Sequence, residues 1–193
     1  MNILPQEGAH EGHDIFELAN LSLAVEMAEK GKYREALKYV EVSKNWPENL
    51  GAGKPYEPDT RFQYYISAYC YEKLNKHSLA DKYYDTIMNF SLSDGGQNPE
   101  PVNIFIKNHI LTENGKKEEV TLAMEKWITE QDSLYNWNIS SGSSSPKAQW
   151  LVAGYNGEEE KAAALEKEIS AVPAENRFRL FLRAYYNFNR GKK

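Results

Sequence analysis

Gly31-Lys32-Tyr33-Arg34-Glu35-Ala36 is the stretch that decides the fold, because a similar hexapeptide returns twice further along the chain. The second copy is Asn75-Lys76-His77-Ser78-Leu79-Ala80, and a fainter third copy is Gly115-Lys116-Lys117-Glu118-Glu119-Val120. The last residues of successive copies are 44 and 40 positions apart. A period in this range is typical of stacked helical hairpins, none of which can bury its apolar face alone. It predicts a repetitive, all-α fold and favours binding over catalysis.

Apolar residues on both sides of the first hexapeptide recur at helical spacing. The segment before it is apolar almost all round, which predicts a helix that lies between neighbours. We expect Asp14 to cap this helix and Gly31 to end it. The segment after it is one-sided, with Ala36, Leu37 and Val40 on the apolar face. Because the connecting loop is so short, the two helices must pack antiparallel.

The same patterns predict a single domain that covers residues 1–193. We expect helical pairs at about 14–46, 59–90, 100–131 and 146–171, followed by a last helix at about 174–190. The segments 48–58, 91–98 and 132–145 are rich in Gly, Pro or Ser and are predicted to be loops. No stretch alternates as a strand would.

Two of these pairs resemble the tetratricopeptide repeat, a helical hairpin in which small and large apolar residues recur at fixed positions. The matching residues of the first pair are Leu23, Ala24, Met27, Ala36, Val40 and Pro47. Those of the second pair are Ser67, Ala68, Tyr71, Ala80 and Tyr84. The third pair departs from the pattern at Asn108 and Val120. The resemblance implies a right-handed helical-hairpin solenoid in which the first helix of each pair lines a concave surface.

Three segments of the first half are similar to the repeat-bearing C-terminal part of large bacterial proteins of unknown function. These segments are Leu4–Ala9, Trp46–Tyr56 and Ala68–Lys73. In those proteins a β-rich, sugar-mutarotase-like region precedes the repeats. The resemblance implies that the chain is a fragment or a stand-alone relative, in a setting of carbohydrate utilisation. It implies no catalytic residue in this chain.

The repeat spacing also predicts a binding groove. Residues one turn apart on the first helix of each pair would project into the concave surface, and most of them are aromatic. They are Leu21, Val25, Tyr65, Tyr69, Phe105, His109, Phe181 and Tyr185. Aromatic rings offer a peptide or a sugar a large contact area, and phenol hydroxyls would orient it. The alternative is that these rings fill the space between successive pairs.

The charge pattern and hydropathy limit the partners. A formal charge of −5 argues against a general nucleic-acid binder. Six basic residues and no acidic one lie between Arg177 and Lys193, which suits the C-terminal end of a helix. No apolar stretch approaches the roughly 18 residues of a membrane span, and Met1–His13 does not resemble a signal peptide. A complete chain would therefore be cytoplasmic, and a fragment would leave a periplasmic or secreted location open.

Three local patterns suggest chemistry, and each has a simpler interpretation. Gly51–Lys54 resembles a phosphate-binding loop but lacks its first Gly and its Ser or Thr, so we interpret it as an ordinary loop. Carboxylates and imidazoles within Glu7–Asp14 could gather a metal, but no second cluster completes the ligand set. Cys70, the only cysteine, and His77 are seven residues apart with a helix break between them. We expect no catalytic residue, metal or cofactor.

These patterns leave three hypotheses about function. The first is a non-enzymatic module that binds a protein segment, or the β-rich part of its own longer protein, in the aromatic groove. The second is a carbohydrate-binding or carbohydrate-processing component in which Glu11, Asp14 or Glu72 acts on a sugar. The third is a structural spacer or dimerisation unit. The sequence does not predict the oligomeric state.

Overall fold

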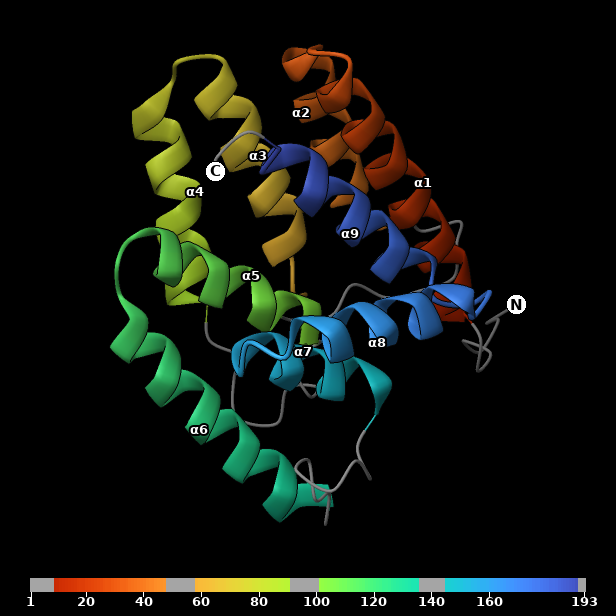
Figure 1. Ribbon diagram of the computed structural model, residues 1–193. Coiled ribbons are helices and arrows are strands. Elements are labelled where there is room, and N and C mark those ends of the chain that lie inside the picture. Colours follow the sequence, from red (N-terminus) through yellow and green to blue (C-terminus); the bar gives the residue numbers. More distant parts are fainter. Residues whose placement is uncertain (1–8, 48–57, 91–100, 136–144, 191–193) are drawn as a thin grey trace, which may run out of the picture. The chain divides into compact units, whose positions relative to one another are not determined.

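The computed structural model describes residues 9–47, 58–90, 101–135 and 145–190 (Figure 1). Within these ranges it contains nine α-helices and no strand, so the prediction of an all-α protein is confirmed. The chain divides into two compact units. Unit 1 takes residues 1–98 and 180–193, and unit 2 takes residues 99–179.

Unit 1 is built from two helical hairpins and the end of the last helix. The hairpins are α1 (Ala9–Glu29) with α2 (Tyr33–Ser43), and α3 (Arg61–Lys73) with α4 (His77–Asn89). In addition to the packing inside each hairpin, α2 and α1 both pack on α3. The second half of α9 (Asn176–Phe188) completes the unit. The fully buried side chains of this core include Leu21, Val25, Ala36, Val40, Phe62, Ile66, Ile87 and Phe181.

Unit 2 contains two further hairpins. They are α5 (Pro101–Glu113) with α6 (Lys117–Tyr135), and α7 (Pro146–Tyr155) with α8 (Glu159–Ala171). The helix α5 also packs on α7. The first residues of α9 belong to this unit, because the boundary between the units falls after Arg179. The core includes Ile106, Leu111, Met124, Trp150, Leu151 and Phe178.

All four hairpins end their first helix with the same turn. In the first hairpin the Gly31 N–H donates to the carbonyl of Ala28 at 3.0 Å, and the Lys32 N–H donates to that of Met27 at 2.8 Å. This pair of bonds is a Schellman motif, which needs one residue in the left-handed conformation. The equivalent bonds occur in the other three hairpins. The left-handed residues and their φ angles are Gly31 (73°), Asn75 (56°), Gly115 (74°) and Gly157 (73°).

This turn explains the hexapeptide that repeats in the sequence. Its first residue takes the left-handed conformation, and its second begins the next helix by accepting a bond from the sixth, as Lys32 does from Ala36 at 3.0 Å. The fourth hairpin has the same geometry, with the Ala162 N–H donating to the Glu158 carbonyl at 2.9 Å. The hexapeptide that starts at Gly157 keeps little of the pattern apart from Gly and Ala, so the sequence alone did not reveal it.

Two predicted details are wrong. Asp14 does not cap the first helix, because α1 already begins at Ala9. The predicted loop 132–145 begins too early, because α6 continues to Tyr135. The other predicted loops lie almost entirely outside the described residues.

Candidate binding face on helices α1 and α3

In unit 1, the second half of α9 covers a surface formed by α1 and α3 (Figure 1). We call this surface the docking face and define it by the four residues that hold α9: Glu29 of α1, and Phe62, Tyr65 and Tyr69 of α3. The α3 residues lie at helical spacing, so their side chains point to one side of the helix. The docking face therefore has an aromatic edge on α3 and an acidic edge at the end of α1.

Two phenylalanines of α9 fill the aromatic edge. The ring of Phe181 meets that of Phe62 edge-on, with centroids 5.8 Å apart. Phe188 stacks on Tyr69, with centroids 3.8 Å apart, and lies 6.0 Å from the ring of Tyr65. Phe181 and Phe188 are both buried. Because they are two helical turns apart, they form one stripe along α9 that matches the row of rings on α3.

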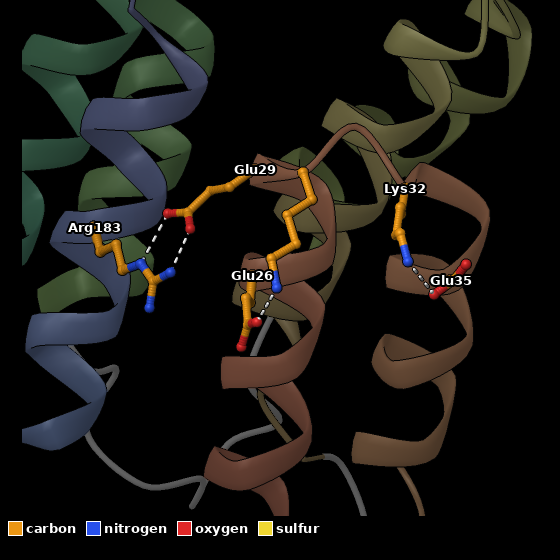
Figure 2. A network of polar contacts seen from close by, with 6 residues as sticks. Glu26, Glu29, Lys32, Glu35 and Arg183 are labelled. Carbon is orange, nitrogen blue, oxygen red and sulfur yellow. Dashed lines mark hydrogen bonds and ion pairs between the residues drawn. The ribbon is translucent and has the colours of Figure 1, made fainter.

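The acidic edge holds α9 through the carboxylate of Glu29 (Figure 2). Arg183 donates from Nε to Oε1 at 2.8 Å and from Nη2 to Oε2, so the pairing is bidentate. Asn187 Nδ2 donates to Oε1 at 2.6 Å. The Glu29 side chain is 21% exposed and that of Arg183 is 48% exposed. The hydrogen bond to Glu29 is the main reason that the pKa of the Arg183 guanidinium is raised.

A further polar contact holds the chain just after α9 on the aromatic edge. Asn189 Nδ2 donates to the hydroxyl of Tyr65 at 3.0 Å, which orients a phenol that is only 4% exposed. The charges agree with these contacts. Residues 180–193 carry four basic side chains and no acidic one, whereas residues 1–98 carry fifteen acidic and ten basic ones. The negative end of the α1 dipole lies beside Glu29 and adds to the attraction for Arg183.

The predicted groove residues of unit 1 lie in its packed interior or under α9. Leu21, Val25 and Phe181 are fully buried, and Tyr65 is nearly so. Tyr69 is half-buried between Phe188 on one side and Tyr33, 6.1 Å away, on another. Tyr185 is half-buried and stacks on Phe181 at 5.9 Å. The residues of this set on α3 and α9 therefore make packing contacts within the protein, mainly with Phe62 and Phe188, and do not line an open groove.

The two remaining groove residues belong to unit 2. The rings of Phe105 and His109 are half-buried, with centroids 6.5 Å apart. Phe105 also stacks on Trp150 at 4.9 Å, and Trp150 meets Phe178 edge-on at 5.0 Å. These rings form a separate aromatic cluster in which Trp150, which the groove prediction did not include, is the central member.

The candidates for chemistry are placed as follows. Burial raises the pKa of the Cys70 thiol to about 12, so this cysteine is a poor nucleophile. His13 is buried and stacks on Trp46 at 3.3 Å, whereas Asp14 is 75% exposed. Glu72 accepts a hydrogen bond from the Tyr84 hydroxyl at 3.0 Å. Among the described residues, no three His, Cys, Asp or Glu side chains are grouped to hold a metal ion.

Other predicted features lie outside the described residues. They are Gly51–Lys54, Glu7, and the side chains of His10 and Glu11. None of the described helices combines the length and the apolar character that a membrane span needs.

Sequence reasoning missed the residues that hold α9 in place, namely Glu29, Arg183, Asn187 and Phe188. Part of the signal was present, because the last helix is basic and carries its large apolar residues on one face. No protein-family model, curated protein or solved structure matches the chain.

Proposed function

We propose that the chain is a non-enzymatic protein-interaction module with a tetratricopeptide-like solenoid, and that its docking face binds an amphipathic helix of a partner. The observation that carries this proposal is the position of α9. A surface that holds one helix by a row of rings, a bidentate ion pair and side-chain amides has what it needs to hold another. Helix-in-groove binding of this kind depends on anchors spaced three, four or seven residues apart.

Support for the solenoid comes from the repeated turn and from the packing in unit 1. Four hairpins with the same Schellman geometry are what a tandem array of one structural unit would produce. The second helix of the first hairpin packs on the first helix of the next, and α1 packs on α3. In an array of this type the first helices form the inner surface, and the docking face belongs to two first helices, α1 and α3.

The contacts favour a helix over an extended peptide as the ligand. Phe181 and Phe188 reach the same row of rings, and Arg183 and Asn187 reach the same carboxylate. On an α-helix, residues four apart lie about 6 Å apart along the axis and residues seven apart about 10.5 Å. An extended strand would place the same side chains roughly twice as far apart, and it would put Phe181 and Phe188 on opposite sides because they are an odd number of residues apart.

A partner must compete with α9 for the docking face. A tethered helix acts at an effective concentration on the order of millimolar, so it lowers the apparent affinity of any free helix. The protein therefore binds weakly while α9 is docked, and tightly once its docking is weakened.

A fluorescent peptide with the sequence of residues 176–190 provides the test. We expect it to bind the full chain carrying Phe188→Ala and to bind the wild-type chain much more weakly, as measured by anisotropy. A scrambled peptide of the same composition is the control. Hydrogen exchange of the amides in α9 reports whether the helix is released. Failure of the peptide to bind a folded chain whose α9 exchanges rapidly would refute the proposal.

A second candidate function, carbohydrate binding, is favoured by another group of rings. Tyr83 stacks on Tyr71 at 5.5 Å and lies 5.7 Å from Tyr64, and Lys44 Nζ lies 5.0 Å from the Tyr64 centroid. These tyrosines are half-exposed and present rings and hydroxyls together, a combination that suits sugars. Calorimetric titration with a panel of oligosaccharides tests this function, and Tyr83→Ala should abolish any binding found.

A further inference from the structure

We infer that the docking face selects a basic helix of a separate polypeptide that carries the pattern Phe-x-Arg-x-x-x-Asn-Phe. Residues 181–188 of α9 have this same pattern. The inference rests on the proposed function and adds the chemistry of the partner to it. In α9 the two Phe residues contact α3, and Arg183 and Asn187 contact Glu29. The partner helix would make the same contacts with its own Phe, Arg and Asn residues.

The carboxylate of Glu29 is the feature that discriminates between helices. It receives two N–H groups from Arg183 and one from Asn187, so its oxygens are matched to donors in a fixed arrangement. Arginine suits this position better than lysine, because its planar group can donate twice to one carboxylate. A helix with an acidic residue at the position of Arg183 would be repelled by Glu29 and by the negative end of the α1 dipole.

The two edges also fix the direction of the bound helix. Phe181 contacts Phe62 near the start of α3, and Phe188 contacts Tyr69 near its end, so α9 runs along α3 in the same sense. Asn189 reinforces this direction through the hydroxyl of Tyr65. A helix bound in the opposite sense would carry its Arg away from Glu29. The pattern therefore specifies both the composition and the orientation of the partner.

The neighbouring Glu26 acts on Arg183 only through its charge, as a smaller cause than Glu29 of the raised Arg183 pKa. Glu26 lies one turn before Glu29 on α1, and its carboxylate pairs with Lys30, the residue that follows the helix (Figure 2). The hydrogen bond to Lys30 is also the main reason that the pKa of Glu26 is lowered. Glu26 is thus a matched control, because it offers the same side chain on the same helix with a different partner.

The experiment is a charge exchange in the full chain. Arg183→Ala with Phe188→Ala opens the docking face without altering Glu29, and Arg183→Ala alone serves if the double variant does not fold. The probe is the peptide of residues 176–190, in its natural sequence or with Arg183→Glu. Circular dichroism and thermal melting show that each variant is folded.

We expect the natural peptide to bind the opened chain and to lose at least about tenfold in affinity when Glu29→Arg is added. The peptide carrying Arg183→Glu should show the reverse preference. Glu26→Arg in the same opened chain should change either affinity much less, by about threefold or less, because Glu26 acts on Arg183 through a screened charge and Glu29 through direct hydrogen bonds.

Each other result overturns the inference. Equal binding of the natural peptide with and without Glu29→Arg would leave a helix-binding face without this charge selectivity, so the proposed function would stand. An equal effect of Glu26→Arg would mean that net charge alone decides. No binding by any opened variant would refute the proposed function as well. A dimer of the opened chain that exchanges α9 between copies, seen by light scattering, would contradict a separate polypeptide as the partner.

Discussion

The ring of Phe188 stacks on that of Tyr69 at 3.8 Å with an angle of 6° between the planes, although all of unit 2 lies between the two residues in the sequence. The contact closes unit 1 by bringing the end of the chain back to its second hairpin. Unit 1 is therefore discontinuous in sequence, and its stability depends on residues that follow unit 2.

Replacing Phe188 by Ala should lower the free energy of unfolding of unit 1 by about 3 kcal/mol, as is typical for a buried Phe. The reason is the loss of two aromatic contacts and the cavity that remains beneath α9. Urea unfolding followed by circular dichroism measures the change. Tyr186→Ala, at a side chain that is 54% exposed, should cost less than about 1 kcal/mol. Equal costs at the two positions would contradict the docked arrangement of α9.

The pair formed by Glu29 and Arg183 should show a coupling energy of about 0.5–1 kcal/mol in a double-mutant cycle, because Arg183 is half exposed to solvent. Glu29→Gln and Arg183→Gln supply the single variants. The coupling should shrink in 1 M salt, where the screening length is about 3 Å. The exposed pair of Lys32 and Glu35, at 3.7 Å, is the comparison and should give less than about 0.3 kcal/mol. A larger coupling there would argue against a special role for Glu29.

Two glycines near the end of α7 should respond in opposite ways to the same change. Gly157→Ala should destabilise unit 2 by about 1–2 kcal/mol, because φ is 73° and alanine is strained there. Gly154→Ala should stabilise it by up to about 1 kcal/mol, since Gly154 lies within the helix and an added Cβ meets nothing within 4 Å. Thermal unfolding of the two variants makes the comparison, and a shift of the same sign for both would contradict the repeated Schellman turn.

Stability should fall at alkaline pH. Burial is the main cause that raises the pKa of Tyr69 to about 12. Burial also raises the pKa of Tyr83 to about 12, and the electrostatic interaction with Tyr71 is the second cause. The pKa of a tyrosine in an unfolded chain is about 10. Between these values the unfolded state releases protons that the folded state retains, so the stabilisation is complete below about pH 10 and is lost as the pH rises through 12. Urea midpoints at pH 8, 10 and 11 measure the slope, which Tyr83→Phe should flatten; identical slopes would contradict the assignment.

The local architecture could be predicted because it depends on short-range chemistry. The position of Gly31 between two apolar periodicities fixes a hairpin without reference to the rest of the chain. The predicted start of α1 at Asp14 is wrong although Asp is a favourable N-cap residue. The helix begins at Ala9, five residues earlier. The hexapeptide beginning at Gly157 was not identified because only the conformation of the turn, and not its side chains, is shared.

The covering of Tyr65 and Tyr69 could not be predicted in the same way. A row of aromatic residues on a helix looks identical in sequence whether it lines an open groove or lies under another helix. The difference depends on Phe188 and Arg183, which are distant in sequence from Tyr69 and Glu29. Sequence periodicity identified which α3 rings share a face, and only the structure shows what lies against them.

The discontinuity of unit 1 has a consequence for protein synthesis. A growing chain leaves the rings of Tyr65 and Tyr69 uncovered by α9 from the time they leave the ribosome until residue 188 has followed. During this interval α9 is not yet available to pack on α3. A chaperone or a ligand that binds at this stage would contact an uncovered aromatic surface.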